Sequence, residues 1–437
     1  MKPTSISIIE KLRNAGHQAY WAGGCVRDIL LGHEPNDYDI VTSAKPEEIE
    51  EILEVTKPVG KEFGVILVIK GEHTFEVASF RSDSGYSDGR RPDAVLFTNA
   101  KEDAQRRDFT INGMFYDPLS DKVFDYVGGQ KDLDAELIRF IGNPHQRILE
   151  DHLRILRAVR FKNQFDFQYH PDTYKALKNH AALIENVTAQ RVHYELNRMI
   201  EGENRAQAFE DLSELGILDH VIPELEALHG VPQPHEYHQE GDVWDHSLRA
   251  LQECDDHASR NVKWAALLHD VGKVDTFSLK ERIRYDGHVS RSREIVHDIF
   301  TRLKFPGKDR RKVEWLVEHH MMMVPLVEMS EGKARKWFLK EDFLNLMQVF
   351  EADAKGIIPR DMSLYEKILK RYREVIKDMP EKPKPFISGK DVMKIMQLSP
   401  GERVGEVLER AYEKQLAREI KSRAEALDWL RSQKKSE

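Results

Sequence analysis

The pattern of apolar and polar positions changes near residue 140. Before that point, short runs of aromatic and β-branched residues, such as Tyr20-Trp21-Ala22 and Ile40-Val41, alternate with stretches of helical spacing. The branched apolar run at residues 65–69 predicts a buried strand, and the alternating residues 74–81 are expected to pair beside it. Beyond about Pro144 the spacing is helical. The chain is therefore predicted to be α+β, with a small mixed sheet and helices at the N-terminus followed by all-helical regions.

Further changes of pattern divide the helical part. Histidines gather between about Pro234 and Lys355, and Lys382-Pro383-Lys384-Pro385 is typical of a linker. Beyond it, residues 404–430 are expected to form one charged amphipathic helix. We therefore expect four parts, at residues 1–140, 141–230, 231–380 and 381–437.

Composition narrows the class of protein. A chain of 437 residues with 40% apolar residues can build about three domains with real cores. Its net charge of −9 requires that any nucleic-acid contact come from local basic patches. Two cysteines, Cys25 and Cys254, exclude a disulfide framework and a cysteine zinc site and indicate a reducing cytoplasm. No apolar run approaches membrane-spanning length, and residues 1–16 predict an amphipathic helix instead of a signal peptide.

The first chemically informative stretch is residues 23–41. Gly23 and Gly24 leave a predicted strand, and such a glycine pair lets backbone N–H groups approach a phosphate. Arg27 can add charge-assisted hydrogen bonds to the same phosphates. Asp37 and Asp39 are two residues apart, so on a strand both carboxylates face the same way. Paired carboxylates suit Mg²⁺ that substrate phosphates also hold, which predicts phosphoryl or nucleotidyl transfer.

Three further segments of the N-terminal part carry candidate groups. Glu76 on the 74–81 strand is either a third carboxylate of the metal site or an exposed strand glutamate. Residues 81–92 are small, polar and contain glycine, so a mobile surface loop is expected there. Residues 106–113 begin with Arg106-Arg107-Asp108 and are expected to open a helix or turn, in which the charges could be incidental to a cap.

The second informative stretch is residues 150–161. Asp151 and Arg154 are three apart and are expected on one helix face, with Arg157 and Arg160 continuing that side. An intrahelical salt bridge with solvated arginines would explain the spacing. The pair could instead recognise cytosine and adenine, since both bases present an amino donor beside a ring-nitrogen acceptor. Guanine and uracil present a carbonyl and an N–H there, so they would be rejected.

The histidine-rich region supplies a third candidate site. Its ordered candidate ligands are His246, His269, Asp270, His288, His320 and Asp353. Imidazole and carboxylate without thiolate suit Mn, Fe, Ni, Co or Mg better than structural zinc. Such a site can bind a phosphate and promote attack by water, although a fold that keeps these residues only for packing is the alternative.

These motifs together resemble two families. The order of residues 23–41, 106–113 and 150–161 resembles the class II tRNA nucleotidyltransferases of the DNA polymerase beta superfamily, with Gly113 where alanine is more usual. The resemblance implies CCA addition to tRNA from CTP and ATP with Mg²⁺ at Asp37 and Asp39. The residues that it implies for nucleotide binding are Gly23, Gly24, Arg27, Arg107, Asp108, Asn112, Asp151, Arg154, Arg157 and Arg160.

The same resemblance assigns roles to other segments. It makes residues 81–92 the loop that reshapes the site between cytidine and adenosine, places residues 191–196 on a supporting helix, and makes the C-terminal part a tRNA-binding tail. The histidine series resembles the HD phosphohydrolases. That likeness implies His246, His269, Asp270 and Asp353 as primary ligands, with His288 and His320 for a second metal or a phosphate.

Two rival functions stay open. One is a narrower or different polymerase, which adds only the terminal adenosine or makes poly(A). The other is an HD-type nucleotide phosphohydrolase whose nucleotidyltransferase head is inactive, although the intact Asp37 and Asp39 argue against it.

Overall fold

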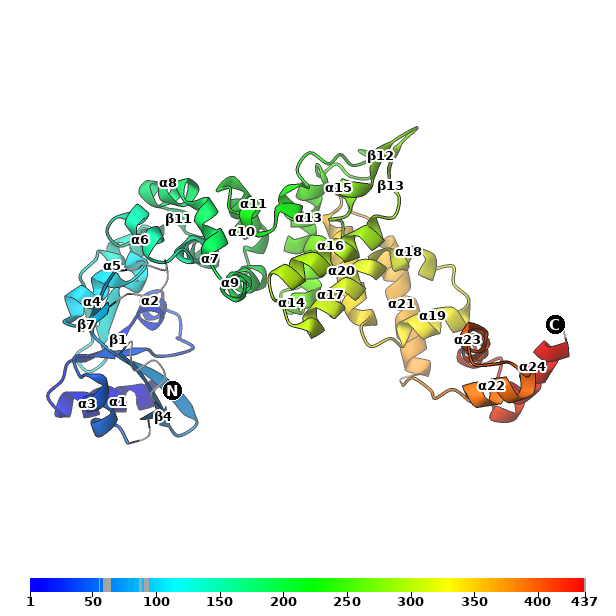
Figure 1. Cartoon of the computed structure of the whole chain (residues 1–437), viewed down its shortest axis with the longest axis horizontal. Helices are drawn as coiled ribbons and strands as arrows, with labels where there is room; N and C mark the ends of the chain where they lie inside the picture. Colours follow the sequence, from blue (N-terminus) through cyan, green and yellow to red (C-terminus); the bar gives the residue numbers. More distant parts are fainter. Residues whose placement is uncertain (55, 58–63, 86–88, 90–93, 380, 436–437) are drawn as a thin grey trace. The chain divides into compact units, whose positions relative to one another are not determined.

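The structure, a computed structural model, describes residues 1–54, 56–57, 64–85, 89, 94–379 and 381–435 (Figure 1). The chain folds as two compact units, Met1–Pro223 (unit 1) and Glu224–Glu437 (unit 2). Among the helices described, none has the length and apolar character needed to cross a bilayer.

The mixed sheet predicted for the N-terminal part is present in unit 1 and confirms the α+β class. Its strand order is β3-β4-β5-β2-β1-β8-β9. Only β2 and β5 pair in parallel within this sheet, and the other neighbours described are antiparallel. The strands are β1 (Ala19–Ala22), β2 (Ile40–Thr42), β3 (Thr56–Lys57), β4 (Val65–Lys70), β5 (His73–Ser79), β8 (Met114–Asp117) and β9 (Lys122–Asp125).

Short two-stranded ladders and helices complete unit 1. The ladders join β6 (Arg81–Ser84) to β7 (Ala94–Phe97) and β10 (Leu137–Ile138) to β11 (Gln168–Tyr169). The helices are α1 (Lys2–Asn14), α2 (Gly24–Leu30), α3 (Pro46–Ile52), α4 (Ala100–Arg106), η2 (Thr110–Asn112), α5 (Gly129–Asp134), α6 (Pro144–Glu150), α7 (Arg154–Phe165), α8 (Pro171–Asn179), η3 (Ala181–Asn186), α9 (Ala189–Glu201), α10 (Arg205–Glu214) and α11 (Leu218–Val221). Helix α12 (Pro223–Glu226) begins at the last residue of unit 1 and continues into unit 2.

Apolar residues at helical and strand spacing build the core of unit 1. The predicted N-terminal helix is present as α1, which buries Ile8, Ile9 and Leu12 on one face. On the sheet, the rings of Tyr20 and Phe115 stack with their centroids 6.4 Å apart. This core fixes the strand ends from which the first candidate site is built.

Unit 2 is helical apart from one hairpin, in which β12 (Phe277–Leu279) pairs with β13 (Ile283–Tyr285). Helices α13, α14 and α20 pack together, and the buried Trp264 ring of α14 contacts Phe300 and Phe305. The helices are α13 (Val243–Gln252), α14 (Arg260–Leu268), α15 (Lys273–Thr276), α16 (His288–Arg302), α17 (Gly307–His319), η4 (His320–Met322), α18 (Met323–Leu326), α19 (Glu331–Phe338), α20 (Phe343–Gly356), α21 (Ser363–Asp378), α22 (Gly389–Met396), α23 (Glu402–Leu416) and α24 (Arg423–Lys435).

Three local predictions are wrong in part. Residues 65–69 form a strand, but only Ile66 and Val68 are buried, because β4 packs one face on the core. The predicted loop at residues 81–92 begins as strand β6, whereas residues 86–88 and 90–92 lie outside the described residues. Residues 404–430 form two helices, since Arg418 between α23 and α24 takes φ +61° and breaks the helical path.

The predicted helix at residues 150–161 is also broken. Asp151 ends α6 in an extended conformation with φ −147° and ψ 105°, and α7 begins only at Arg154. The Asp151 carboxylate accepts a hydrogen bond from the Leu153 N–H, at 3.1 Å, as Asp does just before a helix. Asp151 and Arg154 are therefore not neighbours on one helix face.

The two cysteines lie one in each unit, and both are free and buried. Burial raises the pKa of the Cys25 thiol to about 12, and its sulfur contacts the Ala22 carbonyl oxygen at 3.2 Å. Cys254 packs against Ala266 and Ala352 in unit 2.

Candidate functional sites

A polar cavity of about 520 Å³ opens in unit 1 where β1, β2, α4, α7 and α9 meet. Its lining is rich in arginine and joins four sequence segments that are far apart along the chain. The lining residues are Gly23, Gly24, Arg27, Asp37, Asp39, Arg106, Arg107, Asp108, Asn112, Asp151, Leu153, Arg154, Arg157, Arg160, Phe161, Gln164, Arg191 and Arg198. Every nucleotide-binding residue predicted from the sequence lies in this cavity.

Gly23 lies between a cation and a carboxylate at the start of α2. Its φ of +72° is in the left-handed region, and a Cβ there would lie 3.2 Å from Arg107 Nη1 and 3.9 Å from Asp39 Oδ2. A larger residue would therefore strain the backbone and displace Arg107. Glycine keeps the backbone open toward the cavity beside Asp39.

The carboxylates of the predicted magnesium site gather at the edge of the sheet. Asp37 and Asp39 lie just before β2, and the parallel pairing of Ile40 with Val77 brings Glu76 on β5 beside Asp39. Burial, with the neighbouring charges of Asp37 and Glu76, raises the pKa of Asp39 to about 6. Carboxylates crowded in this way fit a divalent cation, because a cation would offset their mutual repulsion.

Glu76 contributes differently from the two aspartates. Its side chain is exposed, and it is absent from the cavity lining described above. Within the described part of the chain, the groups of three ligand atoms lying within 4.8 Å of one another all belong to unit 2. Glu76 thus influences the charge of Asp39, and its role as a metal ligand stays a prediction.

A chain of hydrogen bonds links α2 to α7 across the cavity. Arg27 Nη1 donates to Asn112 Oδ1 at 2.6 Å, and Asn112 Nδ2 donates to Asp108 Oδ1 at 3.3 Å. Asp108 Oδ2 accepts from Arg157 Nε and Nη2 at 2.8 and 2.6 Å. Burial alone would raise the pKa of Asp108, but the Arg157 guanidinium lowers it to about 2. The network holds the guanidinium groups of Arg27 and Arg157 in defined positions at the cavity wall.

The two residues predicted to select the base have separate partners. Asp151 binds the Arg191 guanidinium of α9, with Nη2 at 2.9 and 3.1 Å from its two oxygens. Arg154 Nη1 donates to Glu150 Oε2 at 2.7 Å and to the Arg147 carbonyl oxygen at 2.8 Å. Both side chains nevertheless line the same cavity.

Sequence reasoning missed the part played by α9. Arg191 and Arg198 line the cavity, and Glu195 between them accepts a hydrogen bond from Arg160 Nε at 2.5 Å. These three residues are spaced i, i+4 and i+7, which places them on one helix face. That spacing was the available signal, but it did not reveal which partners α9 meets.

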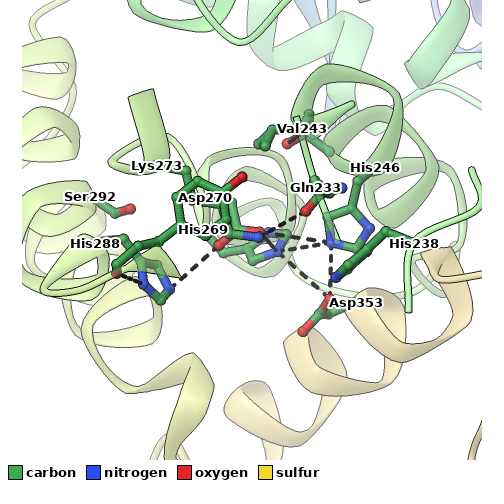
Figure 2. Close-up of polar contacts among 12 residues, drawn as sticks. Gln233, His238, Val243, His246, His269, Asp270, Lys273, His288, Ser292 and Asp353 are labelled. Atoms are coloured by element: carbon green, nitrogen blue, oxygen red, sulfur yellow. Dashed lines mark hydrogen bonds and ion pairs between the residues drawn. The ribbon is translucent and has the colours of Figure 1, made fainter. Parts of the chain in front are cut away.

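The histidine-rich region of unit 2 forms a compact cluster (Figure 2). His246 comes from α13, Asp353 comes from α20, and His269 and Asp270 follow α14. His246 Nε2 lies 3.1 Å from Asp353 Oδ1 and 3.3 Å from His269 Nε2. His269 Nε2 lies 3.2 Å from Asp270 Oδ2. The four predicted primary ligands thus converge, within a cavity of about 860 Å³.

The imidazoles are oriented by their second nitrogens. His269 Nδ1 donates to the Ala266 carbonyl oxygen at 2.8 Å, and His320 Nδ1 donates to the Val317 carbonyl oxygen at 2.8 Å. His288 Nδ1 donates to the Tyr285 carbonyl oxygen at 2.9 Å. An N–H on Nδ1 leaves the lone pair of Nε2 free for a metal. This donor set fits a divalent metal ion.

A second ligand group shares Asp270, which Figure 2 shows between His288 and His246. Asp270 Oδ1 lies 3.6 Å from His288 Nε2 and 3.8 Å from His320 Nε2. The neighbouring His319 instead stacks on Trp315 and takes no part in these ligand groups. The structure therefore brings together all six predicted histidine and carboxylate ligands around one shared aspartate.

Two supporting residues of this cluster were not predicted. Glu240 Oε1 lies 3.1 Å from His246 Nδ1 and 2.7 Å from His238 Nδ1, and Glu240 Oε2 accepts from the Ile358 N–H at 2.8 Å. Lys273 Nζ lies 2.6 Å from Asp270 Oδ2. Lys273 could have been found from its spacing of three residues after Asp270, but Glu240 lies on a loop without periodicity.

Comparisons with known proteins match most of the chain, although residues 140–165, which include Asp151 and Arg154, lie between two of the matched family models. The family models that match are the "Poly A polymerase head domain" over residues 19–139, the "Probable RNA and SrmB-binding site of polymerase A" over residues 166–228, and the "HD domain" over residues 243–371. The CCA-adding enzyme of Bacillus velezensis is 32% identical over 432 residues, which cover 98% of this chain and 97% of that enzyme. That of Bacillus subtilis is 36% identical over 271 residues, 62% of this chain and 64% of the relative.

Solved structures give the same picture. The crystal structure of the Bacillus stearothermophilus CCA-adding enzyme in complex with CTP matches with a TM-score of 0.73 and 25% identity, covering 99% of this chain and 97% of the other. The Thermotoga maritima CCA-adding enzyme complexed with tRNA matches with a TM-score of 0.60, over 99% and 95% of the two chains. At 20% identity, the second match shows a shared fold alone.

Proposed function

The chain belongs to the family of CCA-adding enzymes, and from that premise we propose that it adds CCA to the 3′ end of tRNA, using CTP and ATP. It is a nucleotidyltransferase. The observation that carries the proposal is the single cavity in which a carboxylate pair, an arginine-rich wall and the pair Asp151 and Arg154 meet. These are the groups needed for metal binding, triphosphate binding and base selection.

Different residues of the cavity have different roles in nucleotidyl transfer. Asp37 and Asp39 would hold two Mg²⁺ ions. When bound, these ions would lower the pKa of the attacking 3′-hydroxyl and neutralise negative charge on the departing pyrophosphate. Arg27 and Arg107 flank the glycine turn and hold the triphosphate by charge-assisted hydrogen bonds. Asn112 and Asp108 fix Arg27 and Arg157, so these cations keep their positions as the nucleotide enters.

Base selection follows from the hydrogen-bonding capacity of the Asp151 carboxylate and the Arg154 guanidinium. The carboxylate accepts from the amino group of cytosine or adenine, while the guanidinium donates to the adjacent ring nitrogen. The Arg191 contact holds Asp151 against α9, so one carboxylate oxygen must turn from Arg191 toward the base. Uracil and guanine place a carbonyl against this carboxylate and are rejected.

Incubation of the purified chain with defined RNAs tests this function. tRNA transcripts ending before CCA, or after CC, are supplied with CTP alone, with ATP alone and with both, and an unrelated RNA serves as the comparison. We expect two cytidines from CTP, a single adenosine on the CC end from ATP, and no tailing of the unrelated RNA. Long adenosine tails on the unrelated RNA would identify a poly(A) polymerase instead. Incorporation of adenosine but not cytidine would identify an A-adding enzyme.

We also propose that unit 2 hydrolyses phosphate esters. The supporting observation is that four imidazole Nδ1 atoms are tied to carbonyl or carboxylate oxygens, which leaves Nε2 of each ring for a ligand. His246, His269, Asp270 and Asp353 would hold a divalent ion, Ni, Mn, Co, Fe or Mg, which polarises a phosphate ester toward attack by water. His288 and His320, on the other side of Asp270, would hold a second ion or bind the phosphate.

A role for each part of the chain follows from these assignments. We propose a catalytic head at residues 1–140, a neck for base recognition at 141–230, a hydrolytic domain at 231–380 and a tRNA-binding tail at 381–437. The matched head, RNA-binding and HD regions support the first three parts. A regulatory protein with an inactive head is disfavoured by the intact carboxylate pair of the first cavity.

A further inference from the structure

An exposed aromatic ring lies beside the arginine-rich cavity of unit 1. Tyr194 is 54% exposed and is the most exposed of the aromatic side chains described in that unit. It lies on α9, three residues after Arg191 and four before Arg198, and both arginines line the cavity. Residues at these spacings are neighbours on a helix surface, so the ring stands at the rim of the cavity.

Contacts with Arg198 position the Tyr194 ring, and the ring stays exposed to solvent. Arg198 Nη1 donates a hydrogen bond to the Tyr194 hydroxyl at 3.0 Å, and its guanidinium carbon lies 5.7 Å from the ring centroid. The other arginines of this wall bind carboxylates, with Arg191 on Asp151 and Arg160 on Glu195. Arg198 instead binds an uncharged phenol, so its charge is available to an anion. An exposed aromatic ring beside such a cation is suited to a nucleotide, whose base stacks and whose phosphate pairs.

The reaction needs such a place for its second substrate. Asp151 and Arg154 select the incoming base, and Asp37 and Asp39 lie at the reacting phosphate, so both contacts are taken by the nucleoside triphosphate. The primer must bring its 3′-hydroxyl to that phosphate, and its last base has to lie beside the incoming base. Arg191 on α9 contacts Asp151 directly, and Tyr194 lies one helical turn farther along α9.

We propose that Tyr194 and Arg198 form a stacking site for the RNA primer, with the ring of Tyr194 against the 3′-terminal base and Arg198 on the adjoining phosphate. Stacking suits this task because each base has a π-face, and the primer end changes as the reaction proceeds. Tyr194 is a positioning residue for the primer and makes no contact with the incoming nucleotide. The inference rests on the proposed CCA addition.

Steady-state kinetics of the full-length chain test the site, with tRNA ending in CC as primer and ATP as the nucleotide. Tyr194→Ala should raise the KM for the primer about tenfold, the effect of losing one stacked base. The KM for ATP and kcat at saturating primer should change by less than about twofold. Tyr194→Phe keeps the ring and should recover most of the primer affinity, whereas Tyr194→Leu should not.

A matched control is Tyr174→Ala on α8, which removes another exposed tyrosine that does not line the cavity, and its primer KM should stay unchanged. An unchanged primer KM for Tyr194→Ala would overturn the proposal. A KM for ATP that rises with it would also overturn the proposal, because Tyr194 would then contact the incoming nucleotide. Failure of the wild-type chain to extend any tRNA would instead refute the proposed function.

A crosslinking measurement gives a readout that does not depend on activity. A tRNA carrying 5-iodocytidine at its 3′ end is irradiated with the wild-type chain, and the labelled peptide is identified by mass spectrometry. The label should appear on the peptide that contains Tyr194 and should fall strongly in Tyr194→Leu. A label that stays on other segments in both proteins would contradict the proposed site.

Discussion

The cavities of units 1 and 2 are assembled in contrasting ways. In unit 1 arginines and carboxylates neutralise one another, as in the pairs Arg157–Asp108 and Arg191–Asp151. In unit 2 the ligand side chains converge on one another, and their outer nitrogens are fixed by carbonyl or carboxylate oxygens. At Asp151 the first cavity therefore has to exchange an internal partner, Arg191, for substrate, whereas the second cavity presents an assembled ligand set before any substrate arrives.

This contrast has a physical basis. A carboxylate that already accepts hydrogen bonds from an arginine must free one oxygen before the amino group of a base can donate to it. A metal site gains from ligands that are already oriented, because the cost of ordering them is met on folding. Substitutions in one cavity can show whether the other keeps its activity, and substitutions of the supporting residues can show whether they orient the groups that they contact.

The largest effect is expected from removing the carboxylate pair of unit 1. Asp37→Ala combined with Asp39→Ala should lower nucleotide incorporation by at least about a thousandfold, because the metal ions that offset the transition-state charge lose their ligands. Hydrolysis of bis(p-nitrophenyl) phosphate by the same variant should stay at the wild-type level. Surviving incorporation would show that these carboxylates are not the catalytic pair.

The reciprocal variant tests the cavity of unit 2. His269→Ala combined with Asp270→Ala should abolish hydrolysis and lower the bound transition metal measured by mass spectrometry, because Asp270 lies 3.2 Å from His269 and 3.6 Å from His288. CCA addition should persist, since the two catalytic sets share no residues. Asp353→Asn provides a milder second variant, and loss of both activities in the two variants would indicate a structural metal.

A smaller effect is expected at the base-selecting pair. Asp151→Asn replaces a pure acceptor by an amide, so kcat/KM for CTP and ATP should fall about ten- to a hundredfold. The ratio of kcat/KM for CTP to kcat/KM for UTP should fall by a similar factor. Competition between the two nucleotides on tRNA ending before CCA measures this ratio. Asp166→Asn is the control, since Asp166 is exposed at the end of α7 with φ +56°, which asparagine tolerates. An unchanged preference in Asp151→Asn would assign selection to other residues.

The smallest effect is expected from the support of His246. Glu240→Gln keeps the shape of the side chain but removes the charge beside His246 Nδ1, so metal affinity should fall about ten- to a hundredfold. Calorimetric titration of metal-free protein with Ni²⁺ measures this change. Glu236→Gln, at the exposed mouth of the same cavity, is the matched control. Equal affinities for the two variants would show that Glu240 does not orient the ligand.

The sequence predicted which residues line each cavity more accurately than it predicted how those residues are arranged and paired. The order of the histidine and carboxylate residues identified ligands that converge in unit 2, whereas the alternation of β5 placed Glu76 beside Asp39 but outside the cavity lining. Asp151 shows where this reasoning fails. Spacing predicted a continuous helix, but an Asp that caps the following N–H groups competes with helical geometry, and helix breaks of this kind depend on local capping.

Contacts between residues far apart in the chain could not be predicted from the sequence either. Nothing in the spacing of residues 189–201 shows that Arg191 meets Asp151, forty residues away, because that contact is set by the packing of α7 on α9. The Glu240 contact with His246 likewise arises from the path of a loop. The local chemistry of a motif can thus be predicted, whereas the partner that holds it in place requires the fold.

The burial of both cysteines makes the chain convenient for site-specific labelling. Cys25 and Cys254 are the only thiols in the sequence, each lies inside a different unit, and both are shielded from solvent. Because alkylation requires an accessible thiolate, a maleimide dye should react slowly with the unmodified chain. A cysteine introduced on the surface of each unit would then be the preferred point of attachment. Fluorescence energy transfer between two such dyes would then measure the distance between the two units with and without substrate.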